Sequence, residues 1–205
     1  MGLLAKLSHK IGNDLVKSKV VEAEDAEIYI YGINQILTSV LNVSSALIIG
    51  LIFDVFTEVA VFMAAYIPLR SFAGGYHAKT PLRCYVFSVI MLIVVSIGLK
   101  YLHIADLVYY AVLVAATLVV LVLSPVEDMN KPLDEIEHKI YKKRAIFIAA
   151  MEILIGLAFK LAGLNDLFVA VVFSFATLCF MLVAGKVKGN TAQLTPHCHK
   201  KSDIL

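Results

Sequence analysis

Residues 70–85 read RSFAGGYHAKTPLRCY, a short charged island that contains two adjacent glycines and lies between two apolar runs. The whole chain of 205 residues is 60% hydrophobic and only 17% charged, whereas about a quarter of the residues in a soluble domain are charged. Long apolar runs, in place of the alternation expected of membrane-spanning strands, indicate an integral membrane protein built from helices. The sequence therefore predicts an all-α polytopic membrane protein in which this island separates two spans.

Six apolar segments are long enough to be considered as membrane spans within one membrane domain that comprises the whole chain. They cover residues 28–53, 55–71, 81–99, 106–124, 145–163 and 166–185. A helical span needs about 20 residues at about 1.5 Å each. The second segment is short and contains Glu58 and Pro68, so a tilted, a kinked and a partly spanning helix all stay open for it. We predict a bundle of about six transmembrane helices over residues 28–185.

The two ends of the chain are predicted to lie outside this bundle. Apolar residues recur at roughly helical spacing in residues 1–27, with four lysines largely off that stripe. This pattern is typical of an amphipathic helix on the membrane surface, although a solvated helix packed on the rest of the protein fits it equally. Residues 186–205 read as a polar tail, whose adjacent His197, Cys198 and His199 form a poor metal site because neighbouring residues cannot easily face one ion.

The basic residues are distributed unevenly among the connections between these segments. Sixteen of the 18 Lys and Arg residues fall in residues 1–27, 70–83, 125–144 and 186–205, and only Lys100 and Lys160 lie at the other connections. The positive-inside rule then places both termini and the island on the cytoplasmic side of the membrane.

Within the island, several residues predict a sharp turn followed by a new helix. Gly74 and Gly75 permit positive φ and close backbone approach. Thr80 followed by Pro81 is typical of a helix N-terminus, with Thr80 as the cap. Cys84 would then lie in the first turn of the third span, where the helix dipole and the adjacent Arg83 favour a thiolate, while apolar surroundings favour the neutral thiol.

His77 lies on the predicted turn just before that helix. A chain reversal of a few residues can bring its imidazole over the helix start, where it can take the proton of Cys84 and later return it to a leaving amine. Backbone N–H groups at the helix start could serve as an oxyanion hole. Both residues would also be unremarkable as simple interface residues, so the catalytic interpretation competes with a structural one.

The string R-S-F-A-G-G-Y-H-A-x₅-C, residues 70–84, closely resembles the signature of the accessory gene regulator B family. Members of that family are membrane cysteine endopeptidases that process the precursor of a cyclic autoinducing peptide in Gram-positive bacteria. Chain length, the basic N-terminal arm, the six-segment layout and the Ser124-Pro125 exit from the fourth segment fit the same family. The resemblance implies that His77 and Cys84 are catalytic and that Arg70 and Gly75 are functionally important.

The family also implies a reaction and partners. The expected activity is cleavage of the C-terminal tail from a quorum-sensing precursor peptide through an acyl-enzyme thioester, followed by closure of a thiolactone or lactone ring. The expected partners are the precursor, the lipid bilayer and a second copy of the chain, with no nucleic acid, cofactor or metal. Arg70 would clamp a substrate carboxylate or carbonyl, although snorkelling to the membrane interface is an equally good explanation of an arginine there.

Two other functions remain open at this stage. Six polar residues in the first segment line either a helix–helix face or a pore, and Glu152 is a carboxylate within the fifth segment. Together they favour a small-solute or peptide transporter as the alternative. Glu152 could also orient His77. A third possibility is a non-catalytic membrane partner whose island docks other proteins.

Overall fold

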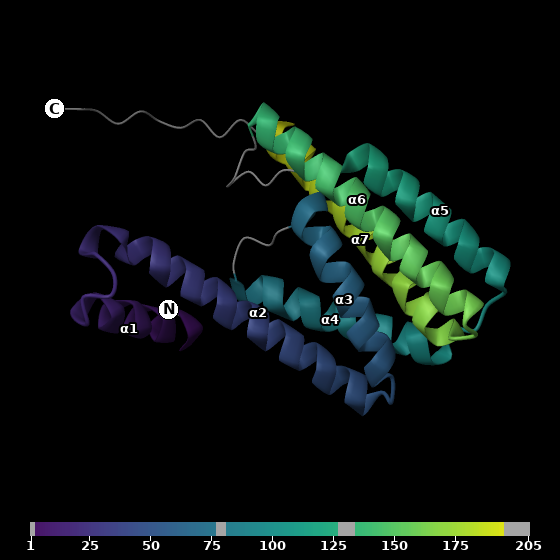
Figure 1. Cartoon of the computed structure of the whole chain (residues 1–205), viewed down its shortest axis with the longest axis horizontal. Coiled ribbons are helices and arrows are strands. Elements are labelled where there is room, and N and C mark those ends of the chain that lie inside the picture. Colours follow the sequence, from purple (N-terminus) through teal and green to yellow (C-terminus); the bar gives the residue numbers. More distant parts are fainter. Residues whose placement is uncertain (1–2, 77–80, 127–133, 195–205) are drawn as a thin grey trace.

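The computed structural model describes residues 3–76, 81–126 and 134–194, and all of its regular elements in these ranges are helices (Figure 1). In chain order they are α1 (Leu3–Lys17), the short 3₁₀ helix η1 (Ala23–Asp25), α2 (Ala26–Ile52), α3 (Phe56–Ala73), α4 (Pro81–Tyr101), α5 (Asp106–Leu123), α6 (Glu135–Leu161) and α7 (Asn165–Leu194). The prediction of an all-α membrane protein is confirmed.

Each predicted apolar segment coincides with one of the helices from α2 to α7. Five of these helices, α2, α3, α4, α5 and α7, are long and apolar enough to cross a membrane. α6 is as long as α2, but Arg144, Glu152 and Lys160 interrupt its apolar part. The exact count of six spans therefore stays a prediction.

α7 is the central helix of the bundle. It packs against α3, α4, α5 and α6. Half of the residues in its apolar 18-residue stretch are buried, compared with 17% for α2 and 22% for α4. In Figure 1, α3 lies between α2 on one side and the group of α5, α6 and α7 on the other. The outer helices turn many large apolar side chains outward, as expected where the surrounding solvent is lipid.

The N-terminal helix predicted from the sequence is present as α1. It lies alongside the first half of α2 (Figure 1), and the approach is close, because a Cβ added at Gly12 would overlap the side chain of Ile30. Leu7 and Ile11 nevertheless remain 42% and 36% exposed. α1 therefore packs on the protein and still presents apolar side chains outward.

Two ion pairs join helix ends at the side of the bundle away from the island. Lys100 Nζ lies 3.1 Å from Asp54 Oδ2, and Lys160 Nζ lies 2.7 Å from Asp106 Oδ1. Both aspartates are largely exposed, so each pair contributes on the order of 1 kcal/mol or less to stability. Their main consequence is local, because they neutralise the two lysines that lie apart from the other basic residues.

The packing of α7 leads to a testable difference between two of its phenylalanines. Phe175 is fully buried, whereas Phe180 on the same helix is 61% exposed. Phe175→Ala is expected to destabilise the protein by about 3–5 kcal/mol, because it removes buried contacts and leaves a cavity. Phe180→Ala should change the stability by well under half of that amount. Thermal unfolding of the two variants in detergent measures the difference, and equal losses would contradict a core centred on α7.

Candidate active site

The island begins inside a helix rather than after it. Residues 70–73 form the last turn of α3, which extends beyond the predicted segment end at residue 71 because its backbone hydrogen bonds continue. Gly74 ends the helix with φ 77° and ψ −149°, and its N–H donates to the Arg70 carbonyl at 2.9 Å. Gly75 follows with φ 135°. The predicted use of positive φ at both glycines is confirmed, and it reverses the chain at this point.

This glycine turn, residues 74–76, is held against α7. The Tyr76 N–H donates to the Met181 carbonyl at 3.0 Å. Gly185, one turn further along α7, faces the same backbone, and a Cβ added there would lie 2.8 Å from the Gly75 carbonyl carbon and 2.9 Å from the Tyr76 nitrogen. Two glycines on different elements therefore allow the turn and the central helix to touch backbone to backbone.

The opposite side of the glycine turn is held by the segment that leaves α5. The Val126 N–H donates to the Ala73 carbonyl at 2.9 Å, and Gly74 and Val126 form an isolated parallel bridge. A Cβ at Gly74 would overlap the Val126 carbonyl oxygen. The turn is thus enclosed by α7 and by the exit of α5, two parts of the chain that the sequence did not connect with it.

Arg70 stabilises the glycine turn from the inside of the bundle. Its Nη2 donates to the Tyr76 carbonyl oxygen at 2.7 Å, and its Cζ lies 5.8 Å from the centre of the Tyr66 ring. Its Nη1 is buried without a hydrogen-bond partner, and no described carboxylate lies within ion-pair distance of the guanidinium. This inward position favours a role of Arg70 in the site over snorkelling to the membrane interface.

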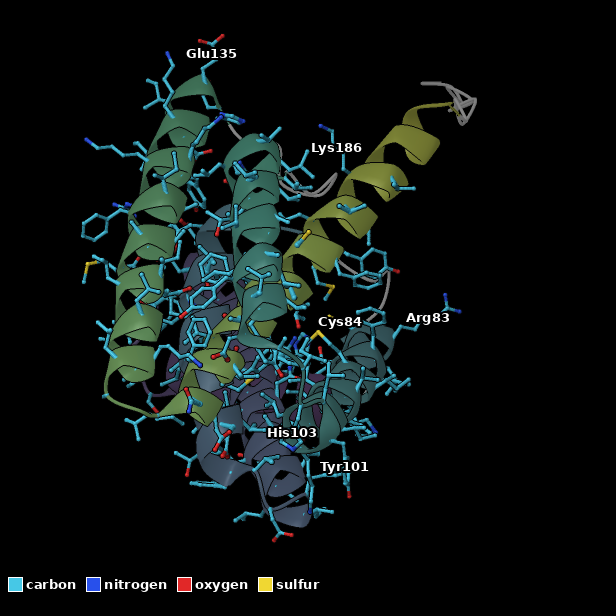
Figure 2. All side chains as sticks on the ribbon, turned by 90° about the vertical axis from the view of Figure 1, so that its right-hand side faces the viewer. Arg83, Cys84, Tyr101, His103, Glu135 and Lys186 are labelled. Carbon is cyan, nitrogen blue, oxygen red and sulfur yellow. The ribbon has the colours of Figure 1, made fainter. Side chains whose placement is uncertain are left out.

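Cys84 lies in the first turn of α4, which begins at Pro81 as predicted. It is a half-buried free thiol. Figure 2 shows the Cys84 sulfur on the inner side of the helix, toward the other helices, while Arg83 extends away from the bundle. The predicted effect of Arg83 on the thiol stays a prediction.

A cavity of about 380 Å³ lies between α2, α3 and α4. Its polar lining consists of Gln35, Ser39 and Asn42 from α2, Tyr66, Arg70 and Ser71 from α3, and Ser88 from α4. Ser88 is one helical turn after Cys84, so the two side chains share a face of α4. The Cys84 thiol therefore lies at the end of the face that forms one wall of the cavity.

Tyr66 and Arg70 line the cavity from α3, and Cys84 is one helical turn from Ser88, which lines it from α4. The three groups thus lie around one cavity, although they come from different turns of α3 and α4. A half-buried thiol, a half-buried cation and a cavity with polar groups among its apolar walls can together hold an extended polar segment beside a nucleophile. They can also stabilise negative charge that develops there.

The cavity shows where part of the polar face of α2 lies. It is also lined by a residue that the sequence analysis did not identify, Tyr66. Gln35, Ser39 and Asn42 recur at a spacing of four and three residues, which places them on one face of α2, and that face lines the cavity. Tyr66 was not singled out, because an isolated tyrosine in an apolar run is usually a core residue. Only its position in the wall of this cavity, with a buried and unpaired hydroxyl, distinguishes it.

Several predicted residues play no described part in this cluster. His77, Thr80 and the tail residues His197, Cys198 and His199 lie outside the described residues. Glu152 is buried in α6 with one carboxylate oxygen unpaired, but it does not line the cavity. Within residues 3–76, 81–126 and 134–194, no group of His, Cys, Asp and Glu could hold a metal ion.

The chain is similar to known proteins over most of its length. The family model described as "Accessory gene regulator B" matches residues 8–182. "Putative AgrB-like protein 2" of Clostridium perfringens is 22% identical over 88% of this chain and 91% of its own length. "Accessory gene regulator protein B" of Staphylococcus carnosus is 26% identical over 55% of this chain and 59% of its own length. No solved structure matches the chain.

The contact between α7 and the glycine turn can be tested with two helical glycines. Gly185→Ala places a methyl group against the Gly75 and Tyr76 backbone, whereas Gly32→Ala places one where nothing lies within 4 Å. Alanine is favoured over glycine in a helix by about 1 kcal/mol. We therefore expect Gly32→Ala to preserve or raise the thermal stability in detergent, and Gly185→Ala to lower it. Similar behaviour of the two variants would show that the turn does not depend on this close approach.

Proposed function

The chain belongs to the accessory gene regulator B family of quorum-sensing proteins, and from this premise we propose that it is a membrane cysteine endopeptidase. Its proposed substrate is the precursor of an autoinducing peptide, from which it removes the C-terminal tail. The observation that carries the proposal is the position of Cys84. It is an inward-facing thiol in the first turn of α4, on the same helix face as the wall of a cavity of about 380 Å³ that carries polar groups.

We assign the role of general base to His77, which follows directly after the clamped glycine turn. Tyr76 is fixed by Met181 and Arg70, and its ring lies 5.7 Å from that of Phe87. Phe87 is one turn beyond Cys84 on α4. The residue before His77 is therefore held beside the first turns of α4, which supports a histidine within reach of the thiol.

In the proposed reaction, His77 takes the proton from Cys84 and the thiolate attacks a backbone carbonyl carbon of the precursor. The tetrahedral intermediate collapses to a thioester as the C–N bond breaks, and the leaving amine takes the proton from His77. An internal cysteine or serine of the precursor then attacks the thioester, which closes a thiolactone or lactone ring and releases Cys84. Water would hydrolyse the thioester, so a site at the edge of an apolar bundle favours ring closure.

The proposed location is the bacterial cell membrane, with both termini and the active site facing the cytoplasm. The distribution of basic residues supports this orientation, and so do the ion pairs that neutralise Lys100 and Lys160. Glu135 and Lys186 lie toward one end of the bundle, and Tyr101 and His103 toward the other (Figure 2). The lipid bilayer and a second copy of the chain are proposed partners, the latter from the family resemblance.

The proposed nucleophile is tested by co-expression with a candidate precursor and detection of the shortened peptide by mass spectrometry. Cys84→Ala should abolish the product while the protein still inserts into the membrane. Cys179→Ala is the matched control, because Cys179 is a free thiol on α7 that does not line the cavity, and it should retain activity. Full activity of Cys84→Ala would reject the proposal and leave a transporter as the better hypothesis for the function.

The proposed orientation is tested with single cysteines introduced into a cysteine-free background. His103 and Glu135 are both exposed and lie at opposite ends of the bundle. A membrane-impermeant maleimide should label His103→Cys in intact cells, and Glu135→Cys only after the cells are permeabilised. The reverse labelling pattern would place the island outside the cell and would contradict a cytoplasmic precursor.

A further inference from the structure

Three buried polar groups without hydrogen-bond partners belong to residues that line the cavity between α2, α3 and α4. They are Asn42 Oδ1, the Tyr66 hydroxyl and Arg70 Nη1. Buried polar groups are normally paired, because an unpaired one loses its hydrogen bonds to water without replacement. Three such groups around one cavity therefore point to a ligand that supplies the missing partners.

Two of the three groups are hydrogen-bond donors, and they are held close together. Tyr66 and Arg70 are one turn apart on α3, and the guanidinium Cζ lies 5.8 Å from the centre of the Tyr66 ring. The Tyr66 ring is only 6% exposed and stacks on Phe62 at 5.4 Å, which fixes its orientation. Asn42 Oδ1, by contrast, is an acceptor and cannot bind a negatively charged oxygen.

The environment of these donors lacks the negative charge that would balance Arg70. Its guanidinium has no carboxylate within ion-pair distance among the described residues. Arg70 as a whole is half-buried, but its Nη1 is fully buried, and buried charge without a counter-ion is costly. Tyr66 and Arg70 line the same cavity as Ser88, which is one turn from Cys84 on α4, so both donors lie beside the helix face that carries the nucleophile. Attack of Cys84 on a carbonyl would bring negative charge to this place.

We propose that the Tyr66 hydroxyl and Arg70 Nη1 form the oxyanion hole for the carbonyl that Cys84 attacks, which makes Tyr66 a catalytic residue. This inference rests on the proposed function. When the Cys84 sulfur bonds to the carbonyl carbon, the π electron pair moves to the carbonyl oxygen, and the two donors bind that oxygen. The pair returns as the C–N bond breaks and the leaving amine receives its proton from His77.

The arrangement meets the requirement for catalysis that binding be stronger in the transition state than in the ground state. The donors are fixed before the reaction by Phe62 and by the bond from Arg70 Nη2 to the Tyr76 carbonyl. Neither donor group is hydrogen-bonded to a group outside this pair. Gly75 also supports the position of Arg70, because a Cβ added at Gly75 would lie 2.9 Å from Arg70 Nη1 and would displace it.

The test compares two tyrosine-to-phenylalanine variants of the full chain in proteoliposomes, with a synthetic precursor as substrate. Tyr66→Phe removes the proposed donor, and kcat should fall about 10²–10³-fold, as for loss of one oxyanion-hole donor, with KM unchanged. Tyr85→Phe is the matched control. Tyr85 neighbours Cys84 on α4, but its hydroxyl is paired with Ser45 Oγ at 2.9 Å, so kcat should be unchanged.

The thermal stability of Tyr66→Phe distinguishes a catalytic role of Tyr66 from a structural one. Tyr66→Phe removes an unpaired buried hydroxyl and should preserve or raise the thermal stability, whereas Tyr85→Phe breaks a hydrogen bond and should lower it slightly. If Tyr66→Phe instead lowers stability together with activity, the structural role is correct and the proposal fails. Arg70→Lys provides a second measurement. It keeps the charge but removes both the Nη1 donor and the Nη2 bond to the Tyr76 carbonyl, so it should lower kcat and thermal stability together, whereas Tyr66→Phe should lower kcat alone.

Three kinetic outcomes would overturn the assignment. An increase of KM alone in Tyr66→Phe would make Tyr66 a substrate-binding residue, and an unchanged kcat would remove it from catalysis. A shift of the pH profile without a lower plateau would show that Tyr66 acts on the ionisation of Cys84. Cys84→Ala is measured in parallel. If Cys84→Ala abolishes the product while Tyr66→Phe retains full kcat, only this inference fails and the proposed function stands.

Discussion

The hydrogen bond from Arg70 Nη2 to the Tyr76 carbonyl is the interaction on which the candidate site depends. It joins the end of α3 to the residue that precedes His77, and it draws the guanidinium inside the bundle. A charged group is tolerated there because it satisfies a backbone carbonyl and lies near the Tyr66 ring. Without this bond, the glycine turn would be held only by its backbone bonds to Met181 and Val126, and the position of the cation would not be defined.

The glycines of the site serve packing as much as chain reversal. Gly74 and Gly75 allow the backbone to turn with positive φ, and Gly185 allows α7 to approach that backbone directly. The central helix of the bundle therefore supports the glycine turn directly. This contact explains how residues 74–76 are held at the edge of an apolar bundle, where side chains alone offer few hydrogen bonds.

The polar cavity and the unpaired donors have a common physical basis. In an apolar protein, each buried polar group must be satisfied or must be retained for a ligand. The face of α2 that carries Gln35, Ser39 and Asn42 and the face of α3 that carries Tyr66 and Arg70 meet at one cavity beside α4. A peptide backbone offers both donors and acceptors, so an extended peptide matches these walls better than a purely apolar ligand would.

The sequence by itself determined the helical class, the apolar segments and the start of α4 at Pro81, because hydrophobic runs, glycine and proline act through local geometry. It also singled out Arg70 and Cys84 through their motif. It could not determine that Gly185 and Val126 enclose the glycine turn, or that Tyr66, Arg70 and a face of α4 line one cavity. These relations join residues far apart in the chain or on separate helices, and only the packing of helices around α7 brings them together.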